Sequence, residues 1–117
     1  DDMISSGDSI IDVAMQLKEK GANRIFVFAT FGLFCNGLDK MDEAFEKGLF
    51  TRIFTTNLVY QMPELLSRSW YASVNMCKYV AYLIDTLNHD QTISGLLDQS
   101  TRIHTLVNRH KAELKKN

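Results

Sequence analysis

The first nine residues carry side chains whose types and spacing suit the binding of an anionic sugar. Two adjacent carboxylates, Asp1 and Asp2, precede the small polar stretch Ser-Ser-Gly-Asp-Ser at residues 5–9. Hydroxyl groups and backbone N–H groups at the start of a helix can surround a phosphate, helped by the helix dipole. Paired carboxylates can accept hydrogen bonds from sugar hydroxyls or hold Mg²⁺ through water. Together these groups predict a ribose-5-phosphate site.

The same stretch has a simpler interpretation as a helix cap. Ser6 or Ser9 could serve as the N-cap of the helix that follows, because serine side chains accept hydrogen bonds from the first free amides of a helix. The doubled aspartate favours the binding interpretation, since adjacent carboxylates without a partner are costly to place. Both interpretations predict a helix directly after this stretch.

A helix and a strand are expected next. Ile10, Val13, Ala14 and Leu17 recur at steps of three and four residues, which predicts a helix over Ser9–Lys20. The following segment, Arg24–Thr30, contains an unbroken apolar run. Such a run is typical of a parallel strand that is buried on both faces.

The rest of the chain continues this alternation of helix and strand. Residues 62–67 are expected to form a short helix or turn, and residues 88–99 a loop with one turn at 93–97. The remaining predicted elements are strands over Arg52–Thr56 and Trp70–Val74 and helices over Leu38–Lys47, Asn75–Leu87 and Thr101–Lys115. The alternation predicts an α/β fold with a parallel sheet. Ligands of such sheets bind beyond the carboxyl ends of the strands, here in loops 1–9, 31–37 and 56–61.

Length and composition narrow the class of protein. The 117 residues correspond to one domain, at roughly 100–200 residues per domain. A net charge of −1 argues against a nucleic-acid-binding protein. No apolar run approaches the ~20 residues of a membrane helix, and the first residues lack the basic region of a secretory signal. Cys35 and Cys77 show no metal-site spacing and are expected to be reduced thiols in a cytoplasmic protein.

Charge and histidine placement in the second half suggest structural roles. Residues 101–117 contain five basic residues and one acid, Glu113. This basic segment is expected to be a helix end that keeps the chain soluble, with contact to an acidic partner as the alternative. His89 is expected in a turn, and the spacing of His104 and His110 does not suit a shared metal ion. No metal ligand is therefore predicted.

Four segments resemble a known enzyme family. Residues 1–9, Asp-Asp-Met-Ile-Ser-Ser-Gly-Asp-Ser, resemble the ribose-phosphate loop of the type I phosphoribosyltransferase fold, in the form found in ribose-phosphate pyrophosphokinases. Residues 28–34, Phe-Ala-Thr-Phe-Gly-Leu-Phe, resemble that family's A-T-H-G-x-F loop and the strand before it. Residues 55–58 resemble its V-T-N-T segment, and residues 76–97 resemble its late helix and turn. The resemblance implies a Rossmann-like, parallel-sheet domain.

The resemblance also implies an activity and a set of ligand contacts. Members of this family transfer the diphosphoryl group of ATP to ribose 5-phosphate, with Mg²⁺, and form phosphoribosyl pyrophosphate. By resemblance, Asp1 would contact the ribose hydroxyls, and Asp2 would lie near the sugar and the diphosphate. The residues that would surround the 5-phosphate are Ser5, Ser6, Gly7, Asp8 and Ser9.

Some residues depart from the family pattern. Asp8 stands where glycine is common, and its carboxylate would repel a phosphate unless it pointed outward. In that case Asp8 would act through its backbone N–H and through the helix dipole. Phe31 replaces the histidine of the A-T-H-G loop. The family's catalytic lysine and arginine loop and its ATP-contacting residues have no counterpart in residues 1–117, so no catalytic residue is expected here.

The resemblance implies that the chain is the C-terminal part of a ribose-phosphate pyrophosphokinase. Residues 1–117 would form one phosphoribosyltransferase-like domain, truncated before its first strand, with residues 101–117 as a terminal helix. The chain would supply the ribose-5-phosphate half-site, be inactive alone and form homo-oligomers. A groove at the sheet edge would be left open for another chain. Two alternatives are a regulatory paralogue that binds the catalytic subunit and a nucleobase phosphoribosyltransferase.

Overall fold

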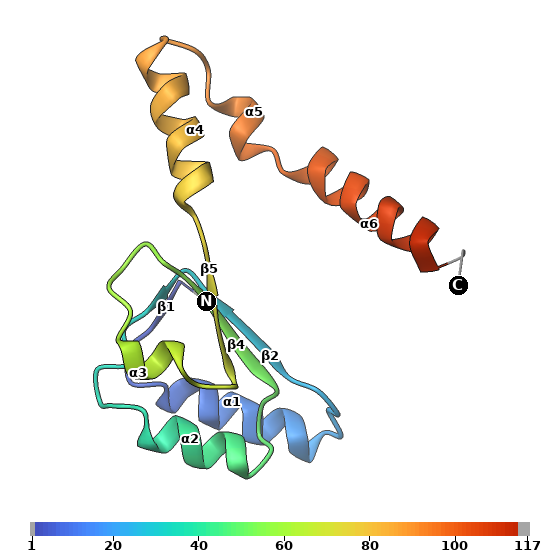
Figure 1. The fold of residues 1–117 in the computed structure, drawn as a ribbon. Helices are drawn as coiled ribbons and strands as arrows, with labels where there is room; N and C mark the ends of the chain where they lie inside the picture. The colour runs from blue at the N-terminus through green and yellow to red at the C-terminus, as the bar shows by residue number, and fades with distance from the viewer. Residues whose placement is uncertain (1, 115–117) are drawn as a thin grey trace. The chain divides into compact units, whose positions relative to one another are not determined.

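The structure, a computed structural model, describes residues 2–114, apart from the side chains of residues 96 and 97 (Figure 1). The chain divides into two compact units, Asp1–Met76 and Cys77–Asn117.

The first unit alternates strands and helices, as the sequence predicts. It contains two parallel sheets, one with the strand order β1-β3 and one with the order β2-β4-β5. Its elements are β1 (Met3–Ile4), α1 (Asp8–Glu19), β2 (Phe26–Ala29), β3 (Phe31–Gly32), α2 (Asp39–Glu46), β4 (Arg52–Thr56), α3 (Pro63–Leu66) and β5 (Tyr71–Val74). The α/β fold class with parallel sheets is therefore confirmed. Strands β1 and β3 are each two residues long and have no counterpart among the predicted elements, because so short a segment leaves no periodicity to read.

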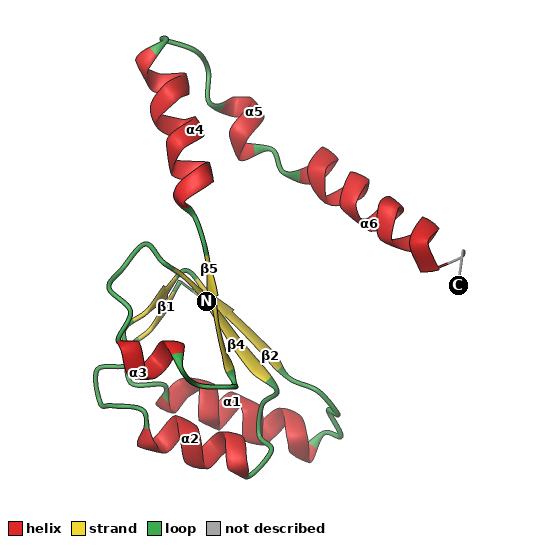
Figure 2. Cartoon of the chain, viewed as in Figure 1, coloured by secondary structure: helices red, strands yellow, loops and turns green. Residues whose placement is uncertain are grey.

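Helices α1 and α2 lie on the same side of the three-stranded sheet (Figure 2). The buried core fills the space beneath them. Ile53 and Met41 are completely buried, and Trp70 is 2% exposed. The Trp70 ring packs edge-on against the rings of Phe50 and Tyr71. The indole Nε1–H donates to Asp42 Oδ1 at 2.7 Å, so this large core side chain also has its polar group satisfied.

The opposite face of the same sheet carries no helix within residues 2–76, and here one prediction is wrong. The sequence predicts that the apolar run around β2 is buried on both faces. Instead, Phe26 and Phe28 are 48% and 63% exposed, and the Phe28 ring stacks on Phe54 of β4 with ring centroids 4.8 Å apart. The side chains alternate along the strand, and the helices of this unit cover only one of its two faces.

Both outer edges of the three-stranded sheet, at β2 and at β5, stay unpaired within the described residues. β2 pairs with β4 on one side, and on the other side a groove of about 400 Å³ separates it from α1. Val13 and Leu17 of α1 and Phe26 and Phe28 of β2 are among the residues that line this groove. The open sheet-edge groove for another chain, which the sequence predicts, stays a prediction.

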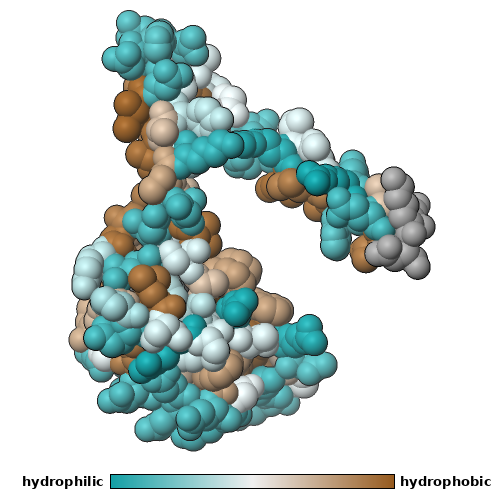
Figure 3. All heavy atoms as spheres, viewed as in Figure 1, coloured by the Kyte–Doolittle hydropathy of each residue, from teal (hydrophilic) through white to brown (hydrophobic). Residues whose placement is uncertain are grey.

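The second unit consists of helices α4 (Cys77–Asn88), α5 (Ser94–Leu97) and α6 (Ser100–Leu114). The predicted helices over 75–87 and 101–115 are thus present within a few residues, although Lys115 lies outside the described residues. The expected turn at 93–97 forms the short helix α5. No described side chain of α4 or α6 is buried, and apolar side chains show on both helices in Figure 3.

Candidate functional site

Pairing of β1 with β3 fixes the position of the loop at residues 5–9. The Asp2 carbonyl accepts a hydrogen bond from the Phe31 amide at 3.0 Å, and the Ile4 carbonyl accepts from Leu33 at 2.9 Å. The Ser5 carbonyl then accepts from the Cys35 amide at 2.9 Å. Two of the loops that the sequence predicts at the ligand edge therefore lie side by side.

Gly7 makes the turn from this loop into α1. Its φ of 89° lies in the left-handed region, which favours glycine. A Cβ at this position would lie 2.5 Å from Met41 Sδ, so the buried side of the turn has no room for a side chain. The Gly7 carbonyl accepts the amides of Ile10 and Ile11, both at 3.1 Å. Gly7, and neither Ser6 nor Ser9, is the N-cap residue, so the simple capping interpretation is wrong in this detail.

The Asp8 side chain is engaged at both of its oxygens. Lys40 Nζ donates to Oδ1 and the Ser6 hydroxyl donates to Oδ2, each at 2.8 Å. The Asp8 amide donates to Ser6 Oγ at 3.3 Å, which closes a small ring. The hydrogen bond from Lys40 holds the pKa of Asp8 below its ordinary 3.8, with Ser6 adding to the effect. The same bond raises the pKa of the Lys40 ammonium above 10.5.

The Asp8 carboxylate bridges two elements: it accepts from the Ser6 hydroxyl of its own loop and from the Lys40 ammonium of α2. The role of Asp8 toward a phosphate stays a prediction. Lys40 has no place in the sequence interpretation because it lies 32 residues from Asp8 along the chain. Only the packing of α1 beside α2 brings the two charges together.

The remaining predicted contact residues differ in their surroundings. Asp2, Ser5 and Ser9 are exposed, Ser6 is half-buried, and Asp1 lies outside the described residues. The Ser5 hydroxyl donates to Cys35 Sγ at 3.9 Å, which links it to the loop after β3. The roles of these residues toward a sugar phosphate stay predictions.

A network of hydrogen-bonded side chains connects the third predicted ligand loop, residues 56–61, to the sheet. Tyr71 Oη lies 2.5 Å from both Thr55 Oγ1 and Gln61 Nε2. Gln61 also donates to the Thr56 carbonyl at 3.2 Å and accepts from Ser73 Oγ at 2.8 Å. These bonds join the carboxyl ends of β4 and β5 to the loop above them.

An apolar pocket of about 390 Å³ lies between the second and third of these loops. Sequence reasoning did not find it, because its walls come from segments about 25 residues apart. The residues that line it are Gly32, Leu33, Cys35, Val59, Tyr60, Met62 and Leu65.

The described residues offer no ready metal centre. No group of three or more His, Cys, Asp or Glu side chains within residues 2–114 is arranged to hold a metal ion. His89 lies in the turn that was expected for it, and its Nδ1 is 2.9 Å from the Asp85 carbonyl. In the same part of the chain, no helix combines the length and hydrophobicity that crossing a membrane requires.

Comparisons with known proteins agree on one family. Residues 1–98 match the phosphoribosyl synthetase-associated domain. A ribose-phosphate pyrophosphokinase of Shewanella oneidensis is 30% identical over 96 residues, which cover 82% of this chain and 30% of that protein. Another, from Mycoplasma genitalium, is 39% identical over 62 residues, which cover 52% of this chain and 19% of that protein.

A solved structure shares the fold. The phosphoribosylpyrophosphate synthetase of Mycobacterium smegmatis superposes with a TM-score of 0.66 and 20% identity, over 77% of this chain and 29% of that one. The chain thus spans about 30% of the length of these larger proteins. With its parallel sheets, its glycine turn into α1 and a sequence match over residues 1–98, the chain belongs to the phosphoribosyl synthetase-associated domain family.

Proposed function

We propose that this chain supplies the ribose-5-phosphate-binding part of a ribose-phosphate diphosphokinase. The full enzyme would transfer diphosphate from ATP to ribose 5-phosphate. The observation that carries the proposal is the left-handed turn at Gly7, which starts α1 directly after a loop of hydroxyl side chains. The first amides of a helix lack the acceptor one turn earlier that later amides have. Here the Asp8 amide donates to Ser6 Oγ at 3.3 Å and the Ile10 amide to the Gly7 carbonyl at 3.1 Å, and both would have to turn to a bound phosphate. A phosphate group fits such a set of donors.

Phosphoryl transfer needs more than this loop provides. Its transition state depends on positioned cations around the moving phosphoryl group. Lys40 is paired with Asp8, and the family's lysine and arginine loop has no counterpart in the sequence. We therefore expect the chain to bind ribose 5-phosphate without turning it over, and to need the rest of the enzyme for catalysis.

Mg²⁺ is the expected cofactor of the full enzyme. Within residues 2–114, no three His, Cys, Asp or Glu side chains are grouped so that they could hold it by themselves. Mg²⁺ commonly uses one or two carboxylates together with substrate phosphates. Asp2, whose side chain is exposed beside β1, could supply one carboxylate. ATP as second substrate, a cytoplasmic location and homo-oligomers belong to the same proposal.

Calorimetry with ribose 5-phosphate tests the proposal. Saturable binding is expected, with ribose giving none, because the phosphate is the group that the loop holds. Ser9→Ala removes an exposed hydroxyl from the loop and should weaken binding. Ser69→Ala removes an exposed hydroxyl just before β5 and serves as the matched control. A wild-type chain and a D8N variant that both fail to bind would contradict the proposal.

A regulatory role is the second candidate, and the Asp8 contacts favour it. In this loop the Asp8 carboxylate already engages the Ser6 hydroxyl and the Lys40 ammonium. Such a loop suits a subunit that keeps the fold but binds substrate weakly. Such a chain would bind a catalytic ribose-phosphate pyrophosphokinase and change its rate. Co-purification with that enzyme, together with a change in its kcat, would support this candidate over the first.

A further inference from the structure

The loop at residues 5–9 contains its own anion. Asp8 is the first residue of α1, so its carboxylate lies at the positive end of the helix dipole. Both of its oxygens accept hydrogen bonds, one from a hydroxyl of the loop and one from the Lys40 ammonium. A phosphate bound by this loop would accept hydrogen bonds from the same kinds of donor.

We propose that Asp8 is an internal competitor for the phosphate group, holding the Ser6 hydroxyl and the Lys40 ammonium that a phosphate monoester would otherwise recruit. The inference rests on the proposed function, since it assumes that the loop takes a sugar phosphate. Under this proposal, Asp8 determines how tightly the loop binds phosphate. Lys40 can contact the phosphate only when Asp8 does not hold its ammonium group.

The hydrogen bonds around Asp8 explain how the competition works. The Ser6 hydroxyl proton points to Asp8 Oδ2, and the Asp8 amide points back to Ser6 Oγ. Two donors of the loop are therefore used internally. A phosphate would have to break this ring and would meet the negative charge of the Asp8 carboxylate close by. Hydrogen bonds with a charged partner are stronger than neutral ones, so the ring resists exchange.

Lys40 is the cation that forms an ion pair with this carboxylate. It lies one residue inside α2, at 2.8 Å from Asp8, and its side chain is 60% exposed. Asp8 and Lys40 line a second groove, which lies between α1 and α2. The other charged residues that line this groove are Glu43 and Lys47, and their charged atoms lie 3.6 Å apart. With Asp8 neutral, Lys40 would be left without its acid and could turn to a bound phosphate.

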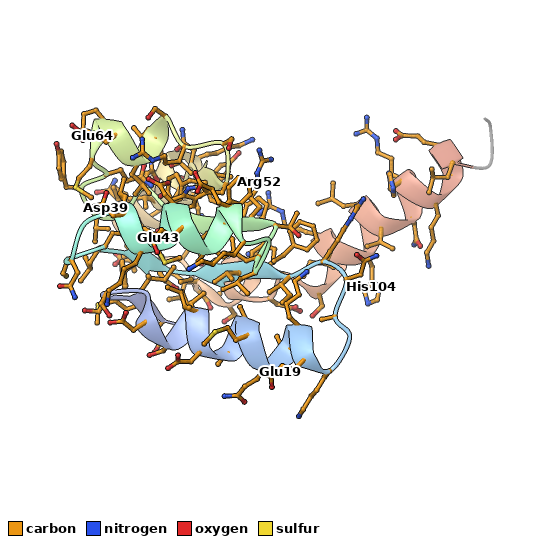
Figure 4. The ribbon with its side chains drawn as sticks, turned by 90° about the horizontal axis from the view of Figure 1, so that it is seen from below. Glu19, Asp39, Glu43, Arg52, Glu64 and His104 are labelled. Atoms are coloured by element: carbon orange, nitrogen blue, oxygen red, sulfur yellow. The ribbon has the colours of Figure 1, made fainter. Side chains whose placement is uncertain are left out.

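Glu43 offers a matched control, because it is an exposed acid on α2 that lines the same groove (Figure 4). Glu43→Gln changes the net charge as Asp8→Asn does, but it leaves the ring of Ser6 and Asp8 intact. A general electrostatic effect would raise phosphate affinity in both variants. The competition proposed here raises it in Asp8→Asn alone.

The test is calorimetric titration of ribose 5-phosphate and inorganic phosphate into the wild type, D8N, E43Q, K40M and the double variant D8N/K40M. We expect D8N to bind both ligands about tenfold more tightly, as the loss of a competing charged hydrogen bond implies. E43Q should bind like the wild type, and D8N/K40M should lose most of the gain. Asp8→Ser serves as a second neutral variant, and circular dichroism checks that each variant is folded.

The possible results separate this inference from the proposed function. Saturable binding by the wild type with no gain in D8N or D8S would overturn the inference and leave the proposed function standing. A gain that persists undiminished in D8N/K40M would overturn the role of Lys40. Binding by D8N but not by the wild type would support the competition in its strongest form. No binding by any variant would overturn the proposed function and this inference with it.

Discussion

The two faces of the three-stranded sheet differ sharply, although the same strands build both. On one face, Ile53 is completely buried and Thr55 is 1% exposed beneath the helices. On the other, Phe28 is 63% exposed and stacks on its neighbour across the sheet. The residues of the open face are as apolar as those of the covered one. The apolar character of a strand therefore does not show whether its side chains are buried. The helices that pack against one face of the sheet decide which side chains are buried.

The covered face should hold most of the stability of the first unit. Ile53→Ala removes a completely buried side chain from the central strand and leaves a cavity. We expect a loss of about 2–4 kcal/mol in the free energy of unfolding. Urea denaturation followed by the fluorescence of Trp70 would measure it. A loss well under 1 kcal/mol would show that the covered face is not the stabilising one.

The contacts of Asp42 with Trp70 and Arg68 should have the next largest effect on the free energy of unfolding. Asp42 accepts from Trp70 Nε1 and forms an ion pair with Arg68, in which Arg68 Nη2 lies 2.9 Å from Oδ2. Asp42→Ala leaves a buried indole N–H without its acceptor and should cost about 1–3 kcal/mol. Asp42→Asn keeps one carbonyl acceptor, so its loss should be smaller. Equal losses in the two variants would assign the effect to the charge alone.

A substitution on the open face should change the stability little and should reduce self-association. Phe28→Ser exchanges a largely exposed ring for a polar side chain, so we expect a change in stability within about 1 kcal/mol. Self-association at high concentration should decrease, because an exposed apolar patch is removed. Analytical ultracentrifugation and urea denaturation measure the two effects. A loss as large as that of Ile53→Ala would mean that this face is covered in solution.

The surface pair between α1 and α2 should have the smallest effect on stability. Because Lys40 lowers the pKa of Asp8 in the folded chain, the stabilisation from Asp8 is present above its ordinary 3.8 and is lost as the pH falls through the lowered value. For Lys40 the sign is reversed, and its stabilisation is present below 10.5 and is lost above the raised pKa. Carboxyl NMR titration should show Asp8 titrating below 3.8 and moving back toward 3.8 in K40M. An Asp8 pKa that does not change in K40M would contradict the pair.

Sequence periodicity located the main helices and strands but not the short pieces that build the site. The four apolar positions of α1 predict that helix to within one residue at each end. Strands β1 and β3 escaped prediction because two residues cannot show a period, yet their pairing places the loop at residues 5–9 beside Phe31 and Cys35. Local order in the sequence predicts long elements, whereas short strands are fixed by their partners.

The candidate site divides in the same way. Its polar loop, its glycine and its resemblance to ribose-phosphate pyrophosphokinases can be read from residues 1–9 alone, because they are consecutive and their chemistry depends on residue type. The contact of Asp8 with Lys40, the lack of space for a side chain at Gly7 beside Met41, and the open face of the sheet involve residues far apart in the chain. Only the tertiary structure decided these, since packing determines which distant charges meet and which apolar surfaces are covered.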